Sequence, residues 1–428
     1  MIKLWQSIVE SNQMLMAFAI SCFLISGIAQ GQEWTRFRGP NGQGISSAKT
    51  IPIKWTENDY NWKVKLPGGG HSSPVLWGDK VFTTVSDPNA SRGILLALSV
   101  SDGKVLWQKE YALKPYRINT LNSFASATPA VDANYVYAVW PTAETTALLA
   151  VSHNGDEVWK QNLAGVHRRH GAGSSPIVVD DIVVFAHEQE PSDSNVESVW
   201  MGFDCKTGKE RWTVKRKNSV FASYSTPCVY SSGGRTQQLI FQSCAHGVTA
   251  IEPRSGVVLW EVDSAFTDRV VSSPVIAGEL IIGTCGEGGT GKRMVAIQPT
   301  KDNSSPPKEK YKIEAASVTY VPTSVAVGEL LFTFHDQGQV SCLRSATGEQ
   351  LWREKPAGRF FGSPVWIDGR LYCITTAGDV VVIKAADKYN LLAINPLGEK
   401  SHATPAVADG RMYLRTYSHL ISIGGQKK

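Results

Sequence analysis

The sequence has no polybasic tract, no clustered cysteines and few charges for its 428 residues. Charged residues make up 19% of the chain, and the formal net charge of +5 is spread along it. Nucleic-acid-binding domains concentrate Lys and Arg in a stripe or patch, so we predict no nucleic-acid partner. No CxxC pair occurs and no two cysteines are adjacent.

Long apolar runs are absent beyond the first thirty residues. The run from Met14 to Ile28 is short for a membrane span, and Ala29-Gln30-Gly31 supplies small residues at a cleavage point. We therefore predict that residues 1–31 are a signal peptide and that the mature protein is periplasmic or extracellular, with no transmembrane span. Lipid anchoring at Cys22 is the alternative, but Ala19 stands where a good lipobox has Leu.

The cysteines of the mature chain are scattered, about one to each repeat described below. This spacing favours small buried hydrophobes on strands rather than a disulfide framework, although the sequence leaves their disulfide state open. The six residues are Cys205, Cys228, Cys244, Cys285, Cys342 and Cys373.

A repeat with a step of about 47 residues runs through the chain, which is the period of a propeller blade. Each copy begins with a Ser/Thr-Pro step followed by an apolar strand, and Val321-Pro322 is a degenerate copy. The regular copies are Ser73-Pro74, Thr128-Pro129, Ser175-Pro176, Thr226-Pro227, Ser273-Pro274, Ser363-Pro364 and Thr404-Pro405. Proline at the start of an innermost strand loses no ladder hydrogen bond that the strand requires.

Each copy ends with a Gly-containing turn and a strand that carries an aromatic residue. In a propeller the sheets spread apart toward the outside, so a large ring fills the widening wedge. We therefore expect the blade tryptophans to be buried between blades, with Tyr311 and Leu392 replacing tryptophan in two copies. These tryptophans are Trp62, Trp107, Trp159, Trp212, Trp260 and Trp352.

The eighth copy, which starts near His402, lacks its outer strand, whereas Asn61–Leu66 forms an extra strand before the first copy. Pairing of these two pieces closes the ring and removes the open sheet edge. We predict an all-β, eight-bladed β-propeller of four-stranded antiparallel blades in residues 61–428, closed by the N-terminal strand. Residues 32–60 are predicted to be an N-terminal extension.

Two segments resemble a known family. Residues 202–212 resemble the PQQ-like propeller signature Ala-x-Asp-x-x-Thr-Gly-x-x-x-Trp, with Gly202 in place of Ala. Residues 34–42 resemble the opening of bacterial secreted PQQ-binding-like propeller proteins. The same repeat serves quinoprotein dehydrogenases and the non-catalytic assembly lipoprotein of the BAM complex. The resemblance therefore implies the fold without selecting one function.

The resemblance also implies what a pyrroloquinoline-quinone (PQQ) enzyme would need. Such dehydrogenases carry an adjacent cysteine pair, carboxylates that bind calcium and an aspartate base at the axis. This chain has no Cys-Cys pair and no convincing calcium set, and it lacks their long insertions. We expect no cofactor, no metal and no PQQ-dependent oxidation. The main prediction is a monomeric, non-catalytic binding or assembly scaffold. A PQQ-dependent oxidoreductase and a polysaccharide-binding module are the alternatives.

Residues 286–292 match the phosphate-loop pattern GxxxxGK. A functional phosphate loop continues with Ser or Thr and opens a helix, whereas Arg293 follows here, and then a strand. We therefore interpret this segment as a hairpin inside the fifth blade.

The loops that lead into the eight innermost strands, here called the leading loops, must all project on one face around the axis. They carry cationic, imidazole and aromatic side chains and no acidic ones, which predicts a basic funnel for an anionic ligand or another exported protein. A merely solvated loop face is the alternative. The predicted residues are His71, Asn122, His167, Arg168, Arg169, His170, Tyr224, Arg269, Tyr320, Arg359, Phe361, Lys400 and His402. No catalytic residue is assigned, because no Ser-His-Asp set or nucleophile elbow is recognisable.

Overall fold

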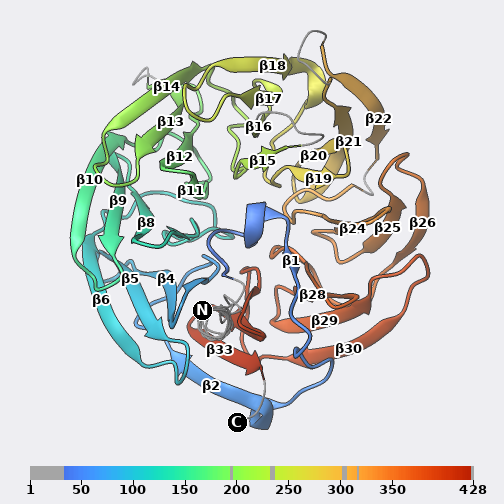
Figure 1. Ribbon diagram of the computed structural model, residues 1–428, viewed down its shortest axis with the longest axis horizontal. Coiled ribbons are helices and arrows are strands. Elements are labelled where there is room, and N and C mark those ends of the chain that lie inside the picture. The colour runs from blue at the N-terminus through green and yellow to red at the C-terminus, as the bar shows by residue number, and fades with distance from the viewer. Residues whose placement is uncertain (1–32, 193–195, 232–236, 301–305, 316–317, 426–428) are drawn as a thin grey trace, which may run out of the picture. The chain divides into compact units, whose positions relative to one another are not determined.

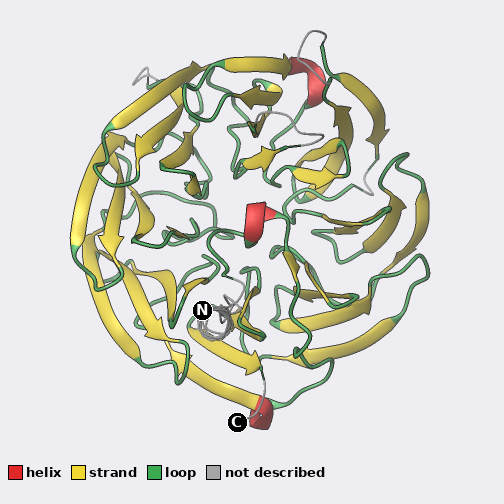
Figure 2. Cartoon of the chain, viewed as in Figure 1, coloured by secondary structure: helices red, strands yellow, loops and turns green. Residues whose placement is uncertain are grey.

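Nearly all regular structure in the computed structural model is β-strand. The structure describes residues 33–192, 196–231, 237–300, 306–315 and 318–425. The predicted signal peptide and Cys22 lie outside the described residues. Within these ranges no helix is long and apolar enough to cross a membrane. The helices are short 3-10 turns (Figure 2), namely η1 Pro40–Gly42, η2 Glu57–Asp59 and η3 Asp263–Ala265.

Eight sheets follow one another around a ring, each with four antiparallel blade strands, and β1 Ile45–Ser46 adds a fifth, parallel strand to the seventh blade (Figure 1). This arrangement confirms the predicted eight-bladed propeller. The innermost strands are β3 Val75–Trp77, β7 Ala130–Val131, β11 Ile177–Val179, β15 Cys228–Tyr230, β19 Val275–Ala277, β23 Val325–Val327, β27 Val365–Ile367 and β31 Ala406–Ala408. The second strands are β4 Lys80–Asp87, β8 Tyr135–Pro141, β12 Ile182–His187, β16 Gln238–Ser243, β20 Leu280–Glu287, β24 Leu330–Phe334, β28 Arg370–Ile374 and β32 Arg411–Arg415.

The outer half of each blade completes the sheet. The third strands are β5 Arg92–Ser99, β9 Thr145–Ser152, β13 Ser198–Asp204, β17 Gly247–Ile251, β21 Thr290–Gln298, β25 Val340–Arg344, β29 Asp379–Lys384 and β33 His419–Gly424. The outermost strands are β6 Val105–Ala112, β10 Glu157–Ala164, β14 Glu210–Arg216, β18 Val258–Val262, β22 Lys308–Glu314, β26 Gln350–Glu354, β30 Leu391–Pro396 and β2 Tyr60–Lys65. The hairpin of β20 and β21, which pairs Glu287 with Thr290, confirms the interpretation of residues 286–292.

Burial follows the position of a strand in its blade. β4 and β5 are buried along their length except at the ends, whereas β6 alternates between exposed and partly buried residues. Neighbouring blades cover both faces of the middle strands, so these strands read as continuous apolar runs. The outermost strand has one face toward solvent and therefore alternates.

The ring is closed by the N-terminal strand, as predicted. β2 pairs antiparallel with β33, and the register places Lys63 opposite Ile421 and Val64 opposite Leu420. The first described strand of the repeat region thus becomes the outermost strand of the eighth blade. Because the last strand is paired on both sides, the closure leaves no open edge between the two ends of the repeat array.

The blade tryptophans differ in their burial. Trp62, Trp159, Trp212 and Trp260 are 6–8% exposed. Trp107 and Trp352 are only partly buried against their clusters, which corrects the expectation that all of them would be enclosed.

The indole of one blade packs over the glycine turn of the next. The indole N–H of Trp159 donates to the carbonyl of Cys205 at 2.8 Å. Gly208 has φ +68°, and a Cβ there would lie 2.6 Å from the Trp159 ring. Glycine is therefore required both by the backbone and by the ring above it.

The two predicted substitutes for tryptophan behave differently. Tyr311 occupies the tryptophan position, and its hydroxyl donates to the carbonyl of Ser345 at 2.9 Å. In the seventh blade the register places Ala393 opposite Val382, whereas Leu392 lies at the β-bulge. The other blades have the same bulge with their aromatic residue directly after it, so the equivalent position is Ala393 and the expectation for Leu392 is wrong.

The predicted extension, residues 32–60, contributes a segment at the centre of the ring. Figures 1 and 2 show η1 near the axis of the propeller. Residues 34–44 hydrogen-bond to the innermost strands of several blades, and β1 Ile45–Ser46 pairs parallel with β27. The inner-strand residues in these bonds are Leu76, Val131, Val229, Ile276 and Trp366.

Arg38 fastens this segment to the sixth blade. Its side chain is fully buried, and its guanidinium donates to the carbonyls of Gly42, Thr323 and Ser324. Burial lowers the pKa of Arg38 to about 9, because the low-dielectric interior disfavours the charged form. Arg36 similarly donates to the carbonyl of Pro227 in the fourth blade.

Candidate functional site

A cavity of about 640 Å³ lies where the leading loops converge. Residues from all eight blades line it, and Phe37 of the central segment also contributes to its wall. The volume lies within the range of about 300–1,000 Å³ that is typical of small-molecule pockets. The predicted residues that line it are His71, Asn122, Arg169, His170, Tyr224, Arg269, Tyr320, Phe361 and His402. Four others do not line it, namely His167, Arg168, Arg359 and Lys400.

Eight hydroxyl groups circle the axis within this cavity, one from each blade. The backbone N–H of seven of these residues donates to the hydroxyl of the next blade, at 2.9–3.1 Å. This hydroxyl ring comprises Ser73, Thr128, Ser175, Thr226, Ser273, Thr323, Ser363 and Thr404. The Ser or Thr of the repeat therefore joins neighbouring blades around the axis.

The sixth blade corrects the sequence alignment of the repeat. Thr323 occupies the ring position, and Ser324 stands where the other blades have proline. Pro322 therefore lies one position before the ring residue rather than one after it, as in Ser73-Pro74. The alignment by proline placed the motif of this blade at Val321-Pro322. Only the hydrogen bonds between blades identify the hydroxyl of Thr323 as the equivalent group.

The hydroxyl ring supports a stability prediction with an internal control. Replacing Thr323 with Val should lower the free energy of unfolding by about 1–3 kcal/mol, because the buried N–H of Ser273 loses its acceptor. Thr226 is the matched control, because within the described residues no ring N–H donates to its hydroxyl; Thr226→Val should change the value by less than about 0.5 kcal/mol. Guanidinium unfolding measures both variants, and equal losses would contradict a role of the ring in joining blades.

Two of the predicted arginines are buried and occupied by protein groups. Arg269 is 4% exposed and forms an ion pair with Glu190 at 3.2 Å. Arg168 is 6% exposed and donates to the carbonyls of Glu188 and Ser223. These contacts correct the prediction of an open cationic funnel, because neither guanidinium presents its whole charge to solvent.

The remaining cations lie at the rim. Arg169, Arg359 and Lys400 are exposed, and only Arg169 lines the cavity. The guanidinium of Arg359 lies 5.7 Å from the ring of Phe361, and the ammonium of Lys400 lies 4.8 Å from the ring of Tyr417. The positive potential of this face is therefore peripheral.

Acidic residues also line the cavity, in contrast to the sequence expectation. Asp336 is 1% exposed, accepts the backbone N–H groups of Tyr320 and Val321, and lies in the wall together with Glu287. Burial raises the pKa of Asp336 to about 6, and the hydrogen bonds from the backbone oppose this rise. The wall thus carries both signs of charge.

A pair of histidines joins the first and eighth blades at the cavity. The rings of His71 and His402 are stacked with centroids 4.3 Å apart. Burial and the neighbouring His402, Arg415 and Lys400 lower the pKa of His71 to about 3. Burial also lowers the pKa of His402, so both rings are held in the neutral form.

Aromatic side chains supply the apolar surface of the cavity. Tyr224 and Tyr320 lie on the fourth and sixth blades, Phe361 on the seventh, and Phe37 on the central segment. Burial raises the pKa of both tyrosines, so each retains its hydroxyl proton. The hydroxyl oxygen of Tyr224 is buried and has no hydrogen-bond partner among the described residues.

Comparisons with known proteins identify the family. A profile of the family described as outer membrane protein assembly factor BamB matches residues 44–189, 120–354 and 336–423. Together these stretches cover most of the chain. The chain belongs to this BamB family. No curated protein matched the sequence.

Solved structures extend the likeness of this BamB-family propeller. BamB from Moraxella catarrhalis has a TM-score of 0.59 at 13% identity, covering 89% of this chain and 98% of its own. Quinohemoprotein alcohol dehydrogenase from Comamonas testosteroni has a TM-score of 0.63 at 12% identity, covering 95% and 82%. The computationally designed Ika8 protein has a TM-score of 0.58 at 10% identity, covering 86% and 100%. At these identities the likeness establishes the fold alone.

Sequence reasoning missed several lining residues of this BamB-family cavity. It considered only the leading loops, but the loops between second and third strands must project on the same face, because adjacent strands alternate in direction. Glu287 and Asp336 lie at or beside such loops, and so does Glu190, the partner of Arg269. Alternation of strand direction was the signal that could have found them.

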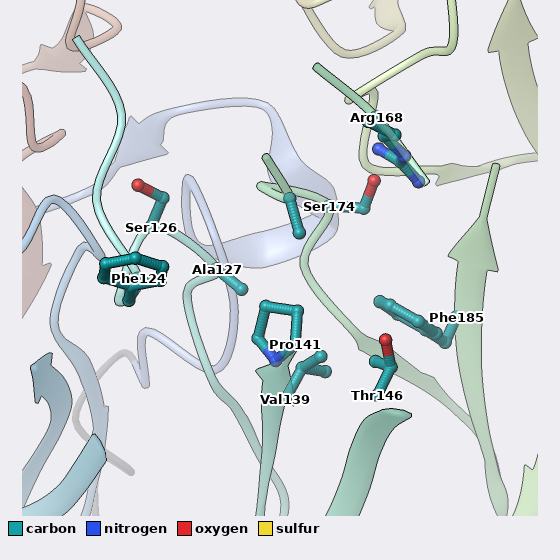
Figure 3. Close-up of a pocket in the computed structure, with 10 residues that line it drawn as sticks. Phe124, Ser126, Ala127, Val139, Pro141, Thr146, Arg168, Ser174 and Phe185 are labelled. Carbon is teal, nitrogen blue, oxygen red and sulfur yellow. The ribbon is translucent and has the colours of Figure 1, made fainter. Parts of the chain in front are cut away.

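A second, much smaller pocket lies between the second and third blades (Figure 3). Its volume is about 10 Å³, and the hydroxyls of Thr146 and Ser174 beside it have no hydrogen-bond partner among the described residues. This space suits one buried water molecule and no larger ligand. The candidate site is therefore the large cavity.

Proposed function

We propose that this BamB-family propeller is an exported, non-catalytic assembly scaffold that docks another exported protein on the face of the leading loops. The observation that carries this proposal is the convergence of all eight blades on one cavity, whose rim carries Arg169, Arg359 and Lys400. Exposed charges around a concave surface steer a complementary partner and fix its orientation. The outer-membrane assembly role named for the family agrees with this function.

The donor groups of the chain support a scaffold rather than a PQQ enzyme. Across the described residues, no three His, Cys, Asp or Glu side chains gather as a metal-binding group. The six cysteines of the mature chain are free, and five of them are buried. The residues present therefore do not fit a calcium-bound quinone held beside a cysteine pair.

Charge reversal at the rim tests the docking function. Arg169→Glu, Arg359→Glu and Lys400→Glu combined should reduce recovery of the partner from a native extract at least tenfold, because rim charges control association. Raising the salt concentration to 1 M should weaken the wild-type interaction, since the Debye length falls to about 3 Å. Pull-down with quantitative mass spectrometry measures both effects.

The matched control reverses three cations on the opposite face. Lys104, Lys206 and Lys209 are exposed in turns between third and fourth strands. Their triple change to Glu alters the net charge equally and should leave recovery unchanged. Equal recovery by both triple variants would refute docking on the leading-loop face.

A further inference from the structure

A side chain that does not belong to any blade also lines the large cavity. Phe37 lies in the segment that Arg36 and Arg38 fasten to the fourth and sixth blades. The cavity wall therefore includes an aromatic ring on a segment that is held in place by its neighbouring arginines. This ring offers an apolar surface to a ligand that enters from the leading loops.

The hydroxyl ring surrounds the ligand space with groups that still have a proton to donate. Seven of the eight hydroxyls accept a backbone N–H, and within the described residues none donates to a protein acceptor. A hydroxyl has one proton and two acceptor sites, so each ring member keeps a rotatable O–H. Such a ring matches a ligand with oxygen atoms distributed around its edge.

The charges of the wall favour a neutral ligand. Arg169 and Arg269 are opposed by Glu287 and Asp336, and Arg269 is also paired with Glu190. An anion would gain from the arginines but lose against the carboxylates at the same wall. Among the described residues, three that line the cavity have a buried polar atom without a hydrogen-bond partner, namely Nε of Arg269, the hydroxyl of Tyr224 and Nδ1 of His71. Buried polar groups of this kind require a hydrogen-bonding partner, which a bound ligand would supply.

We propose that the cavity binds the end of a short neutral oligosaccharide. The C–H face of a pyranose ring packs on an aromatic side chain, and its radiating hydroxyls both donate and accept. The aromatic rings, the hydroxyl ring and the mixed carboxylate and guanidinium groups supply the complementary surfaces. This inference rests on the proposed function in placing binding on the leading-loop face, and it names the chemical class that enters the cavity.

Titration calorimetry with neutral trisaccharides tests the inference on the full mature protein. The probes are cellotriose, maltotriose and N,N′,N″-triacetylchitotriose, each used up to about 10 mM, which covers weak millimolar affinities. We expect at least one to bind, with an affinity that is unchanged between low and high salt because the ligand has no net charge. Tyr224→Phe should weaken binding about tenfold, because it removes one buried hydrogen bond to the ligand.

Tyr224→Phe is suited to this test because the hydroxyl of Tyr224 has no hydrogen bond within the described protein. Its removal therefore leaves no other protein group without a hydrogen-bond partner. Tyr111→Phe is the matched control; its hydroxyl oxygen is also buried on β6, and the residue does not line the cavity. It should leave the affinity unchanged. Binding of none of the three sugars would overturn the inference, and so would binding of adenosine or inorganic phosphate in their place.

The two proposals fail separately. If charge reversal at the rim abolishes partner recovery but no sugar binds, the scaffold function is supported and the oligosaccharide proposal is refuted. Sugar binding that Tyr224→Phe leaves unchanged would place the ligand outside the cavity and overturn the inference. If a sugar binds but charge reversal at the rim leaves partner recovery unchanged, the docking proposal is refuted instead.

Discussion

Replacing Arg38 with Met is expected to lower the free energy of unfolding by about 3–5 kcal/mol. The change removes the donors for buried carbonyls of Thr323 and Ser324 in the sixth blade and of Gly42 in the central segment. Each stranded buried acceptor costs about 1–3 kcal/mol. The charge of Arg38 is itself disfavoured by burial, as its lowered pKa indicates, and relief of this cost offsets part of the loss. Guanidinium unfolding followed by circular dichroism measures the change.

Lys49→Met is the control for Arg38. Lys49 follows the same segment but is exposed, so its replacement should change the free energy of unfolding by less than about 0.5 kcal/mol. A loss below about 1 kcal/mol for Arg38→Met would mean that the central segment contributes little to holding the blades together.

Replacing Trp212 with Ala is also expected to cost about 3–5 kcal/mol, as for other large truncations in a core. Trp212 is 6% exposed, and its indole N–H donates to the carbonyl of Pro253 in the next blade at 2.9 Å. The ring also lies over Gly256, so the truncation leaves a cavity between two blades. Chemical denaturation followed by circular dichroism avoids dependence on the fluorescence of the removed residue.

Trp352→Ala provides the comparison within the same repeat. Trp352 occupies the equivalent position but is only partly buried. Its truncation should cost about 1–2 kcal/mol, because less apolar area returns to water. Equal losses at Trp212 and Trp352 would show that the repeat position, rather than burial, sets the contribution of the ring.

The candidate site was only partly predictable. The leading loops were located correctly, and nine of their thirteen singled-out residues line the cavity. The prediction of a purely basic site was incomplete, because the repeat pattern revealed neither the pairing of Arg269 nor the position of Asp336 in the wall. Both depend on loops that are distant along the chain, such as the contact of Arg269 with Glu190 across two blades.

The sequence by itself determined the propeller, its number of blades and its closing strand. The blades follow from contacts within one repeat or between consecutive repeats, so a period of alternating strands and turns records them directly. The closing strand joins the two ends of the chain, and it was predictable because one copy lacked a strand that the other end had in excess. Trp159 above Gly208 illustrates this locality, because each blade places its ring over the turn of the next.

Only the tertiary structure decided which side chains face the axis and which charges they meet. Phe37 comes from the central segment, which is not part of the repeat, whereas Glu287 and Asp336 lie at or beside the loops between second and third strands of two consecutive blades. Arg168 and Arg269 resemble open cationic sites in the sequence but are buried against carbonyls and a carboxylate. The physical reason is that a buried charge must find a partner through space, and the ring geometry brings those partners together from blades far apart in the chain.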